Sequence, residues 1–473
     1  MFFPLLFLAV IILFKNAFFI NFFIDDFFFL KIGKAHSFID FWKFFWPVKS
    51  YFYRPIPTEF FYYLINSVKS NVLSAHLLVF VVYFVGLYFA YLSLLKLTNN
   101  KLLSKITIIL YSLSFIHVFQ LYQLATFIEI ALFTFISISF YLFLEKKYFL
   151  SLLFFVFACM SKETSILFPV FLAAVVIFNK NVLPKKRMFF LYFLVSAIFA
   201  FIYKFGVGSV VAVSTYKIQL KPRLGINNLM WYSLWSLGLP NFMPDYFTSI
   251  FRKPIPDFWK VWKSNQIKTY FLLFSVYFTL LMSSLVIFLT KNKRNLKEFA
   301  IYLFISIFSF ILFISPTLLI IHKWMVRLTL PLFFVSFIEA YLIVNLIKSG
   351  KKLRFLGYAL IIIYIFSNVL AVAVHESSST YLLESAISKN AKQYFEKNKK
   401  EIVKYHFIFF KDSNNVKYNP WGGSQKLKVT LSDQNFIDHF FPGADLKAVY
   451  GFESKTIPKD SYIVSSYDIL LQR

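Results

Sequence analysis

Long apolar runs separated by short polar connections dominate the hydrophobic pattern of the chain. A run of about 20 apolar residues can cross the hydrocarbon core of a bilayer as a helix. Two of the runs, Tyr148 to Met160 and Thr164 to Phe178, are short for a full span, so as a pair they either dip into the membrane or line a cavity. In total the pattern predicts about eleven membrane segments: Met1 to Ile24, Val72 to Leu97, Ile106 to Phe119, Leu124 to Leu144, Tyr148 to Met160, Thr164 to Phe178, Met188 to Val213, Tyr270 to Thr290, Phe299 to Ile321, Leu328 to Ile347 and Phe355 to Val374.

Every second connection between these segments is short and rich in lysine and arginine residues. Basic residues of short loops are retained on the cytoplasmic side of a membrane. With an odd number of spans, the pattern predicts a multi-pass plasma membrane protein with a cytoplasmic N-terminus and an extracytoplasmic C-terminus. The basic connections contain Lys101 and Lys105; Lys146 and Lys147; Lys180, Lys185, Lys186 and Arg187; Lys291, Lys293, Arg294 and Lys297; and Lys348, Lys351, Lys352 and Arg354.

Two outer connections are long, residues 25–71 and 214–269, and mix aromatic residues with lysines. This mixture is typical of helices that lie in the membrane interface, and we expect them to roof a cavity between the spans. The expected architecture is an all-α polytopic core, residues 1–374, followed by a small extracytoplasmic α/β domain, residues 375–473. In that domain a charged helix, Glu384 to Tyr405, precedes strand-like runs at Phe407 to Phe410, Leu427 to Leu431, Lys447 to Tyr450 and Tyr462 to Ser465.

The composition excludes an ordinary soluble protein. Of the 473 residues, 59% are hydrophobic and only 15% are charged, whereas charged residues make up about a quarter of a soluble domain. The formal net charge of +28 lies mostly in short clusters between apolar runs, so it indicates lipid headgroups as partners and not nucleic acid. The single cysteine, Cys159, excludes an intrachain disulfide and a cysteine-based metal site.

The unusual polar residues map to the outer face or the outer ends of the predicted spans. Ionisable groups near membrane depth are costly and usually face a functional cavity. Their shared location therefore predicts an active site that faces outward. The residues are Asp25, Asp26, His36, Arg54, Glu59, His117, Gln120, Gln123, Glu129, Lys162, Glu163, His322, Lys323 and Arg327.

Two interpretations of the adjacent carboxylates Asp25 and Asp26 stay open. Aspartate is a preferred N-cap, so the pair suits the start of a helix at Phe27. In the catalytic interpretation, one carboxylate accepts a proton from an attacking hydroxyl, and its neighbour positions the acceptor or adjusts the first one's pKa. A divalent metal bound through Asp25 or Asp26 stays open as an alternative, but it is not indicated, because no tight group of further carboxylates accompanies them.

Two further motifs suit a phosphate. Arg54 is followed by Pro55, and a guanidinium held on a stiff segment matches a phosphate bidentately; the alternative is an arginine that only reaches the membrane interface. Lys162 and Glu163 suit either a local ion pair in a turn or a functional pair. In the functional interpretation Lys162 neutralises a leaving phosphate, and Glu163 orients it or binds sugar hydroxyls.

Positive charge also lies at the outer end of a later span, at His322 and Arg327. Basic residues usually lie on the cytoplasmic side, so positive charge at an outer end indicates an anionic partner. A plain membrane anchor is the alternative. Glu59, in the first outer loop, is a further candidate for positioning a sugar or an acceptor.

Together these motifs resemble the GT-C superfamily of polyprenyl-phosphate-sugar glycosyltransferases, most closely its protein O-mannosyltransferase-like members. The resemblance covers roughly Met1 to Leu346. It implies a multi-span core roofed by interfacial helices, an outward active site, inversion at the sugar carbon, and Asp25 or Asp26 as base or acceptor-positioning group. The motifs that carry it are Asp25-Asp26, Ser50-Tyr51-Phe52-Tyr53-Arg54-Pro55, Ser161-Lys162-Glu163-Thr164 leading to Pro169, and Arg327 before Pro331.

The sequence therefore predicts an enzyme that moves a sugar from a polyprenyl-phosphate donor to a hydroxyl of a glycan, lipid or protein acceptor. Arg54, Lys162 and either His322 or Arg327 are expected to hold the donor phosphate. No cofactor is called for, and no glycine-rich nucleotide motif is visible, which suits a lipid donor. A transporter or flippase of lipid-linked glycans is the alternative; it should carry polar residues through mid-depth and often shows internal repeats.

Overall fold

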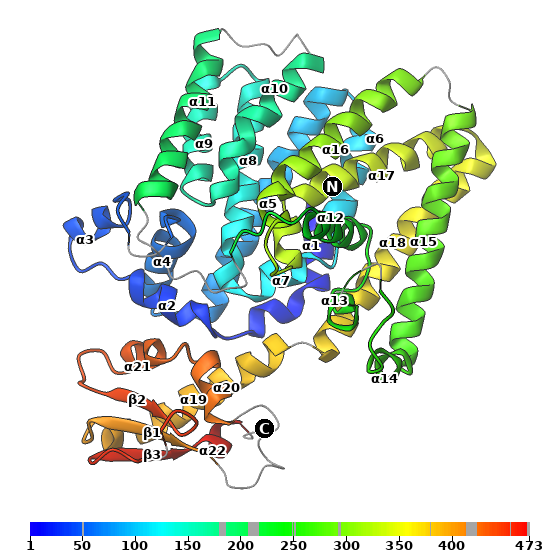
Figure 1. Ribbon diagram of the computed structural model, residues 1–473. Coiled ribbons are helices and arrows are strands. Elements are labelled where there is room, and N and C mark those ends of the chain that lie inside the picture. The colour runs from blue at the N-terminus through cyan, green and yellow to red at the C-terminus, as the bar shows by residue number, and fades with distance from the viewer. Residues whose placement is uncertain are drawn as a thin grey trace.

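The computed structural model describes residues 1–49, 52–178, 186–206, 217–247, 249, 252–291, 295–378, 380–412, 423–454 and 456–470. Most of these residues are helical, and a small sheet lies near the C-terminus (Figure 1). Some residues of the predicted loops and motifs fall outside the described ranges: Ser50, Tyr51, Lys180, Lys185, Lys293 and Arg294.

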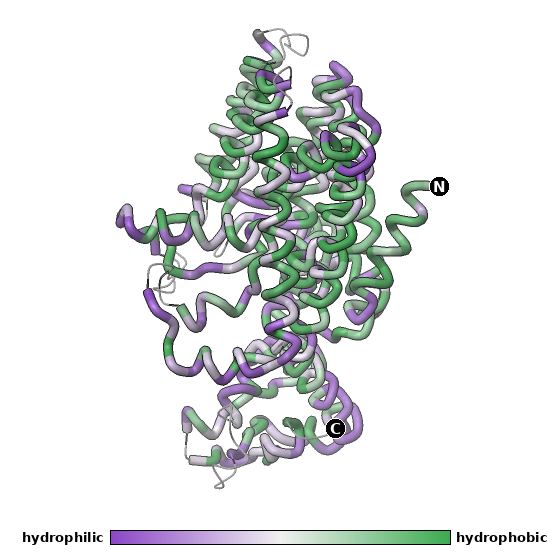
Figure 2. Tube along the Cα trace, turned by 90° about the vertical axis from the view of Figure 1, so that its right-hand side faces the viewer, coloured by the Kyte–Doolittle hydropathy of each residue, from purple (hydrophilic) through white to green (hydrophobic). Residues whose placement is uncertain are grey.

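Seven described helices are long and apolar enough to cross a membrane, so the chain is a polytopic membrane protein, as predicted. Hydrophobic residues follow these helices along their length in Figure 2, whereas the C-terminal region mixes hydrophilic and hydrophobic residues. The expected count of about eleven spans is not confirmed. The seven are α5 (Val72–Thr98), α8 (Phe127–Leu144) with the preceding 3-10 helix η3 (Leu124–Thr126), α11 (Lys186–Phe201) with the following π-helix η6 (Ile202–Gly206), α15 (Asn265–Lys291), α16 (Leu296–Leu318), α17 (Pro331–Lys348) and α18 (Lys351–Ser378).

The other four predicted spans form shorter helices. The short pair contains 12 residues in α9 and 11 in α10, and at about 1.5 Å per residue each reaches little more than half of a hydrocarbon core of about 30 Å. The helices that replace the four spans are α1 (Phe2–Leu13) with η1 (Lys15–Phe19); α6 (Lys101–Ser112) with α7 (His117–Tyr122); α9 (Tyr148–Cys159); and η4 (Glu163–Leu167) with α10 (Phe168–Phe178).

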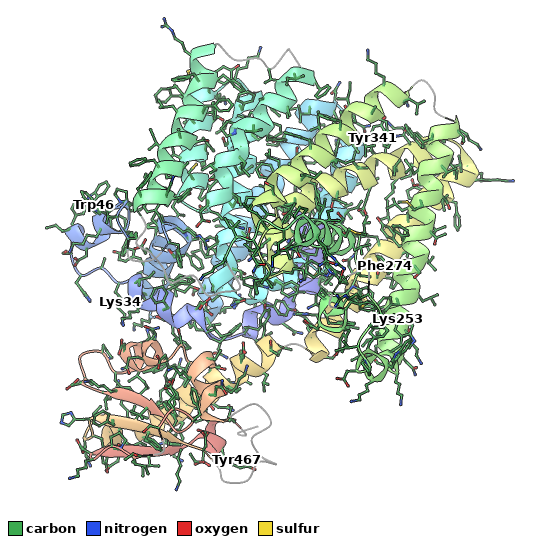
Figure 3. The ribbon with its side chains drawn as sticks, viewed as in Figure 1. Lys34, Trp46, Lys253, Phe274, Tyr341 and Tyr467 are labelled. Carbon is green, nitrogen blue, oxygen red and sulfur yellow. The ribbon has the colours of Figure 1, made fainter. Side chains whose placement is uncertain are left out.

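The two long loops differ in how their aromatic residues are placed. In the first loop Trp42 and Trp46 are 57% and 64% exposed, and Trp46 lies at the margin of the molecule (Figure 3). In the second loop Trp231 and Trp235 are buried, both on α12 (Pro222–Ser236), which packs against α16. The first loop forms α2 (Asp25–Ile32), α3 (Phe38–Lys43), η2 (Ile56–Phe60) and α4 (Phe61–Ser67), and the second continues with α13 (Met243–Tyr246) and α14 (Phe258–Trp262).

The C-terminal region forms a three-stranded parallel sheet in the order β2-β1-β3. Three predicted strands are confirmed, but the strand at Leu427 to Leu431 is wrong, because this segment belongs to α20. Its buried residues Leu427 and Thr430 are three apart, the spacing of one helix face. The elements are α19 (Thr380–Ile402), β1 (Phe407–Lys411), α20 (Ser424–Thr430), α21 (Gln434–Phe440), β2 (Lys447–Tyr450), β3 (Ser461–Ser465) and α22 (Ser466–Leu470).

This C-terminal domain packs directly on α2. The rings of Phe27 on α2 and Phe436 on α21 meet edge to face, with centroids 5.0 Å apart. The Ile24 amide donates to the Thr430 carbonyl at 2.7 Å. In Figure 1, α2, α4 and the C-terminal domain lie at one end of the bundle, and the adjoining ends of α10 and α11 and of α15 and α16 lie at the other. The predicted outer elements therefore share one end, while their orientation in the membrane stays a prediction.

Candidate functional site

Asp26 holds the first loop together. Its Oδ1 accepts a hydrogen bond from the Tyr62 hydroxyl at 2.6 Å, and its Oδ2 accepts one from the Phe23 amide at 3.0 Å. The side chain is buried, and this burial raises its pKa to about 7. α2 begins at Asp25 with Ile24 at the N-cap position and no side-chain cap, so the expectation that the aspartates cap a helix beginning at Phe27 is wrong. Asp26 lies in the first turn of α2, and its carboxylate ties the Phe23 amide to that turn.

Asp25 is placed differently. Its side chain is exposed, and it makes no hydrogen bond or ion pair with any residue that the structure describes. Loss of water to the surrounding protein nevertheless raises its pKa above the usual value. Asp25 is therefore a solvent-accessible carboxylate in a crowded setting, where a raised pKa suits a general base.

Arg54 and Glu163 form a bidentate ion pair. The Arg54 Nε atom lies 2.9 Å from Glu163 Oε1, and Nη2 lies 3.0 Å from Oε2. The guanidinium also lies 4.9 Å from the centroid of the Phe52 ring. The structure thus joins two sequence-predicted motifs, but a carboxylate occupies the fork of Arg54 that was expected to hold a phosphate.

A second, more buried ion pair joins Lys162 to Glu129 on α8. Their side chains are 12% and 7% exposed. The charges of Arg54 and Glu163 act on Lys162 as well, so the four groups form one network of two cations and two anions. Because a carboxylate opposes each cation, the network as a whole carries no formal charge.

Glu59 on η2 is also paired. Its Oε1 atom accepts from Lys49 Nζ at 2.6 Å, and both side chains are almost inaccessible to solvent. The buried ion pair fixes η2 against the segment before Arg54. This geometry gives Glu59 a structural contact, and its predicted role in positioning a sugar stays untested.

Arg327 lies in the short 3-10 helix η9 (Met325–Leu328) before α17. Its Nη1 atom donates to the His322 carbonyl at 2.6 Å, and Nη2 lies 3.4 Å from His322 Nδ1. Loss of water, together with the charges of Arg327 and Lys323, lowers the pKa of His322. His322 is therefore a neutral imidazole at pH 7 and supplies hydrogen bonds in place of charge.

A small polar pocket brings two of the predicted phosphate-binding residues together. Lys162 and Arg327 both line it, with Glu129, Thr164 and Pro331. Its volume is about 10 Å³, close to the space for one water molecule. A phosphate therefore fits only after side chains such as Lys162 move.

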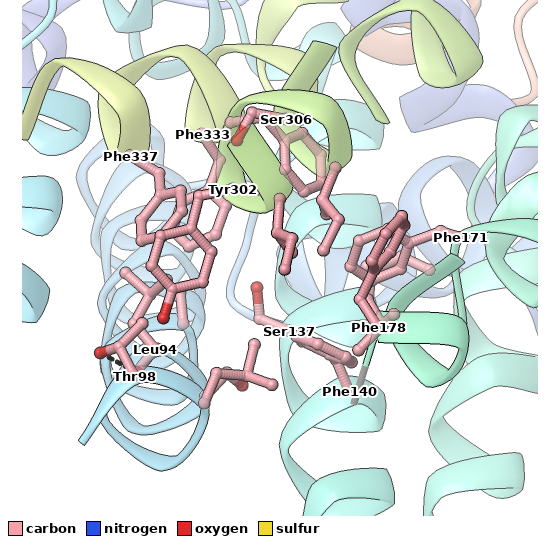
Figure 4. A pocket seen from close by; sticks show the side chains of 18 of the residues that line it. Leu94, Thr98, Ser137, Phe140, Phe171, Phe178, Tyr302, Ser306, Phe333 and Phe337 are labelled. Carbon is pink, nitrogen blue, oxygen red and sulfur yellow. Dashed lines mark hydrogen bonds between the residues drawn. The ribbon is translucent and has the colours of Figure 1, made fainter. Parts of the chain in front are cut away.

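A much larger apolar cavity of about 470 Å³ adjoins this pocket. Leu330 lines both spaces, and residues of α5, α8, α10, α16 and α17 form the walls. Figure 4 shows Phe171 and Phe178 on one side of the cavity and Phe333 and Phe337 on the other. A polar pocket at the end of an apolar cavity suits an amphiphile with an anionic head.

The carboxylates of α2 belong to the same end of the bundle. α2 contacts both η2, which follows Arg54, and η3, which precedes Glu129. The Ala125 amide of η3 acts on the Asp26 carboxylate. The elements that carry Asp25 and Asp26 are therefore in contact with those next to Arg54 and Glu129.

Sequence reasoning missed the partners that organise this site. Glu129 is among the polar residues that the sequence predicts at the outer face, but no local pattern reveals that it binds Lys162 or that Tyr62 binds Asp26. It also missed Glu339, a buried carboxyl in the middle of α17. Among the residues that the structure describes, no group of three or more potential metal ligands is found.

The fold and the site define a polytopic membrane protein with an ionic cluster and a small α/β domain at one end of its helices. No protein-family model matches the sequence, and no curated protein matches it either. The resemblance to GT-C glycosyltransferases therefore stays a prediction that rests on this chain's own residues.

Proposed function

We propose that this protein transfers a sugar from a polyprenyl-phosphate donor to an acceptor hydroxyl, with inversion at the sugar carbon. The observation that carries the proposal is the polar pocket of Lys162 and Arg327 at the end of the 470 Å³ apolar cavity. Such a pair of spaces suits a ligand with a hydrocarbon tail and a phosphate head.

The donor phosphate is held by Lys162 and Arg327, and its tail lies among the phenylalanines of α8, α10 and α17. When the phosphate enters, it replaces Glu129 as the partner of Lys162. The negative charges of the phosphate and of Glu129 would then repel each other, so Glu129 turns away or takes up a proton. Arg54 and Glu163 remain paired beside this position, where Glu163 is placed to accept hydrogen bonds from sugar hydroxyls. Preorganised cations stabilise the charge that grows on the departing phosphate.

Asp25 is the proposed base. As the acceptor oxygen attacks the sugar carbon, its proton passes to the Asp25 carboxylate, and the bond to the donor oxygen breaks with its electron pair leaving on the phosphate. Asp25 is accessible and unpaired among the described residues, whereas both oxygens of Asp26 already accept hydrogen bonds. Asp26 therefore positions α2 and does not take the proton.

The experiment is complementation of a deletion strain of the native host, followed by mass spectrometry of its lipid-linked sugars. Loss of the protein is expected to cause a polyprenyl-phosphate sugar to accumulate, and Asp25→Asn to leave that accumulation in place at normal protein level. The matched control is Asp257→Asn, at an exposed aspartate that forms a surface ion pair with Lys260, and this variant should restore wild-type levels. Full restoration by Asp25→Asn removes the catalytic assignment.

A further inference from the structure

A second apolar cavity lies beside the first. It has a volume of about 480 Å³ and is bounded by α12, α15, α16 and α17. Ser306 and Phe334 line both cavities, so the two spaces are neighbours across the contact of α16 with α17. The proposed sugar donor occupies the first cavity only, which leaves this one without an assigned ligand.

One acid group, Glu339, lines this mainly apolar space, together with the hydroxyl residues Ser233, Ser236 and Ser306. It lies halfway along α17, in the middle of a candidate membrane span, and its side chain is only 3% exposed. Its Oε1 atom has no hydrogen-bond partner among the described residues, although the Tyr277 hydroxyl of α15 faces the carboxyl. An ionisable residue at this depth is costly and marks a functional site by default.

The cavity is reached from the hydrocarbon region of the membrane. Met282 on α15, together with Ile307 and Ile311 on α16, lines the cavity, and these side chains, on two candidate membrane spans, are 36%, 51% and 40% exposed. A ligand that enters between these residues must come from the bilayer and not from water. The occupant is therefore soluble in lipid.

The lining also restricts the polar group of the ligand. A cation would have to give up its water ligands for a site that offers one carboxyl. The hydroxyls of Ser233 and Ser236, which also line the cavity, already donate hydrogen bonds to backbone carbonyls. A metal ion needs several oxygen ligands, and none of the described residues form such a group here. A neutral hydroxyl needs only one acceptor, which the carboxyl of Glu339 provides.

We propose that this cavity binds a long-chain alcohol of the membrane. Its hydroxyl donates a hydrogen bond to Glu339, and its hydrocarbon chain lies along the apolar walls of α12, α15 and α16. The site is separate from the proposed sugar-transfer site and is tested by binding alone.

The test uses the purified full-length protein in detergent and a hexadecanol derivative that carries a photoreactive diazirine. Labelling is expected on peptides of α15, α16 and α17, and unlabelled hexadecanol should compete about tenfold better than hexadecane, which has no hydroxyl. Glu339→Leu should remove this preference by weakening alcohol binding about tenfold while hexadecane competes as before. Glu396→Leu, at an exposed glutamate of α19, is the matched control and should behave as the wild-type protein.

Equal competition by the alcohol and the alkane overturns the proposal, and so does an unchanged preference in Glu339→Leu. A water molecule trapped between Glu339 and Tyr277 is the alternative occupant, and it predicts equal competition. If Glu339→Leu does not fold, Met282→Trp tests the same site by adding bulk to the wall that faces the bilayer. This variant should reduce labelling about tenfold, and undiminished labelling refutes the proposed cavity.

Discussion

Substitutions of Lys162 and Glu129, singly and together, test whether Lys162 serves only to stabilise the fold or also binds the donor phosphate. The two side chains are 12% and 7% exposed, so either charge is left buried when its partner is removed. The cost of such an uncompensated charge is about 3–5 kcal/mol. We expect Lys162→Met and Glu129→Leu each to lower the free energy of unfolding by that amount.

The double variant, Lys162→Met with Glu129→Leu, should unfold with nearly the wild-type free energy. Replacing both members of a buried ion pair by apolar residues of similar size is often neutral or stabilising. The coupling free energy of the cycle, which is the change in the double variant minus the changes in the two single variants, then has a magnitude of about 6–10 kcal/mol. The same cycle on Lys31 and Asp438, whose side chains are 48% and 33% exposed, is the matched control and should give at most about 1 kcal/mol.

The assay is denaturant unfolding in detergent, followed by the fluorescence of the 8 tryptophans, combined with the lipid-linked sugar measurement in the deletion strain. If Lys162 holds the donor phosphate, the double variant is stable and yet inactive. A double variant that is stable and fully active refutes the phosphate role. Single variants as stable as the wild-type protein refute the energetic reasoning about burial.

Two further predictions concern the topology and the first loop. In whole cells, a membrane-impermeant thiol reagent should label Asn241→Cys and not Lys186→Cys, with little background because the single native cysteine, Cys159, is buried; the reverse pattern overturns the predicted orientation. Burial raises the pKa of Asp26 from 3.8 to about 7, so the stability due to its protonation is full below about pH 4 and is lost as pH rises through about 7. Asp26→Asn should flatten the unfolding free energy across that range, and an unchanged slope in calorimetric or denaturant titrations contradicts the assignment.

The candidate site shows how far local patterns reach. The sequence predicts that Arg54, Lys162 and Arg327 lie near the ends of helices, because charged residues that interrupt apolar runs are visible in the sequence alone. It left two interpretations of Asp25 and Asp26 open. Only the folded chain separates them, because the hydroxyl of Tyr62, 36 residues away, occupies Asp26 and leaves Asp25 accessible.

The span count marks a similar limit. Hydropathy identifies apolar segments but not where a helix within them ends. The lengths of α9 and α10 depend on the turn at Lys162 and on η4, which separate the two helices. The ion pair of Lys162 with Glu129 on α8 holds that turn in place. The strand expected at Leu427 became α20 for a comparable reason. Its apolar side chains pack on the C-terminal domain as one face of a helix, and a short apolar run does not reveal which partner it will meet.

The sequence by itself determined that this is a multi-pass membrane protein with many of its unusual polar residues near helix ends, because hydrophobicity and charge are properties of each segment alone. Tertiary structure decided which charges are neutralised: Arg54 faces Glu163, Lys162 faces Glu129, and both pairs join segments that are distant in the chain. It also decided where the two cavities lie, since such spaces arise from the packing of several helices and no single helix encodes them.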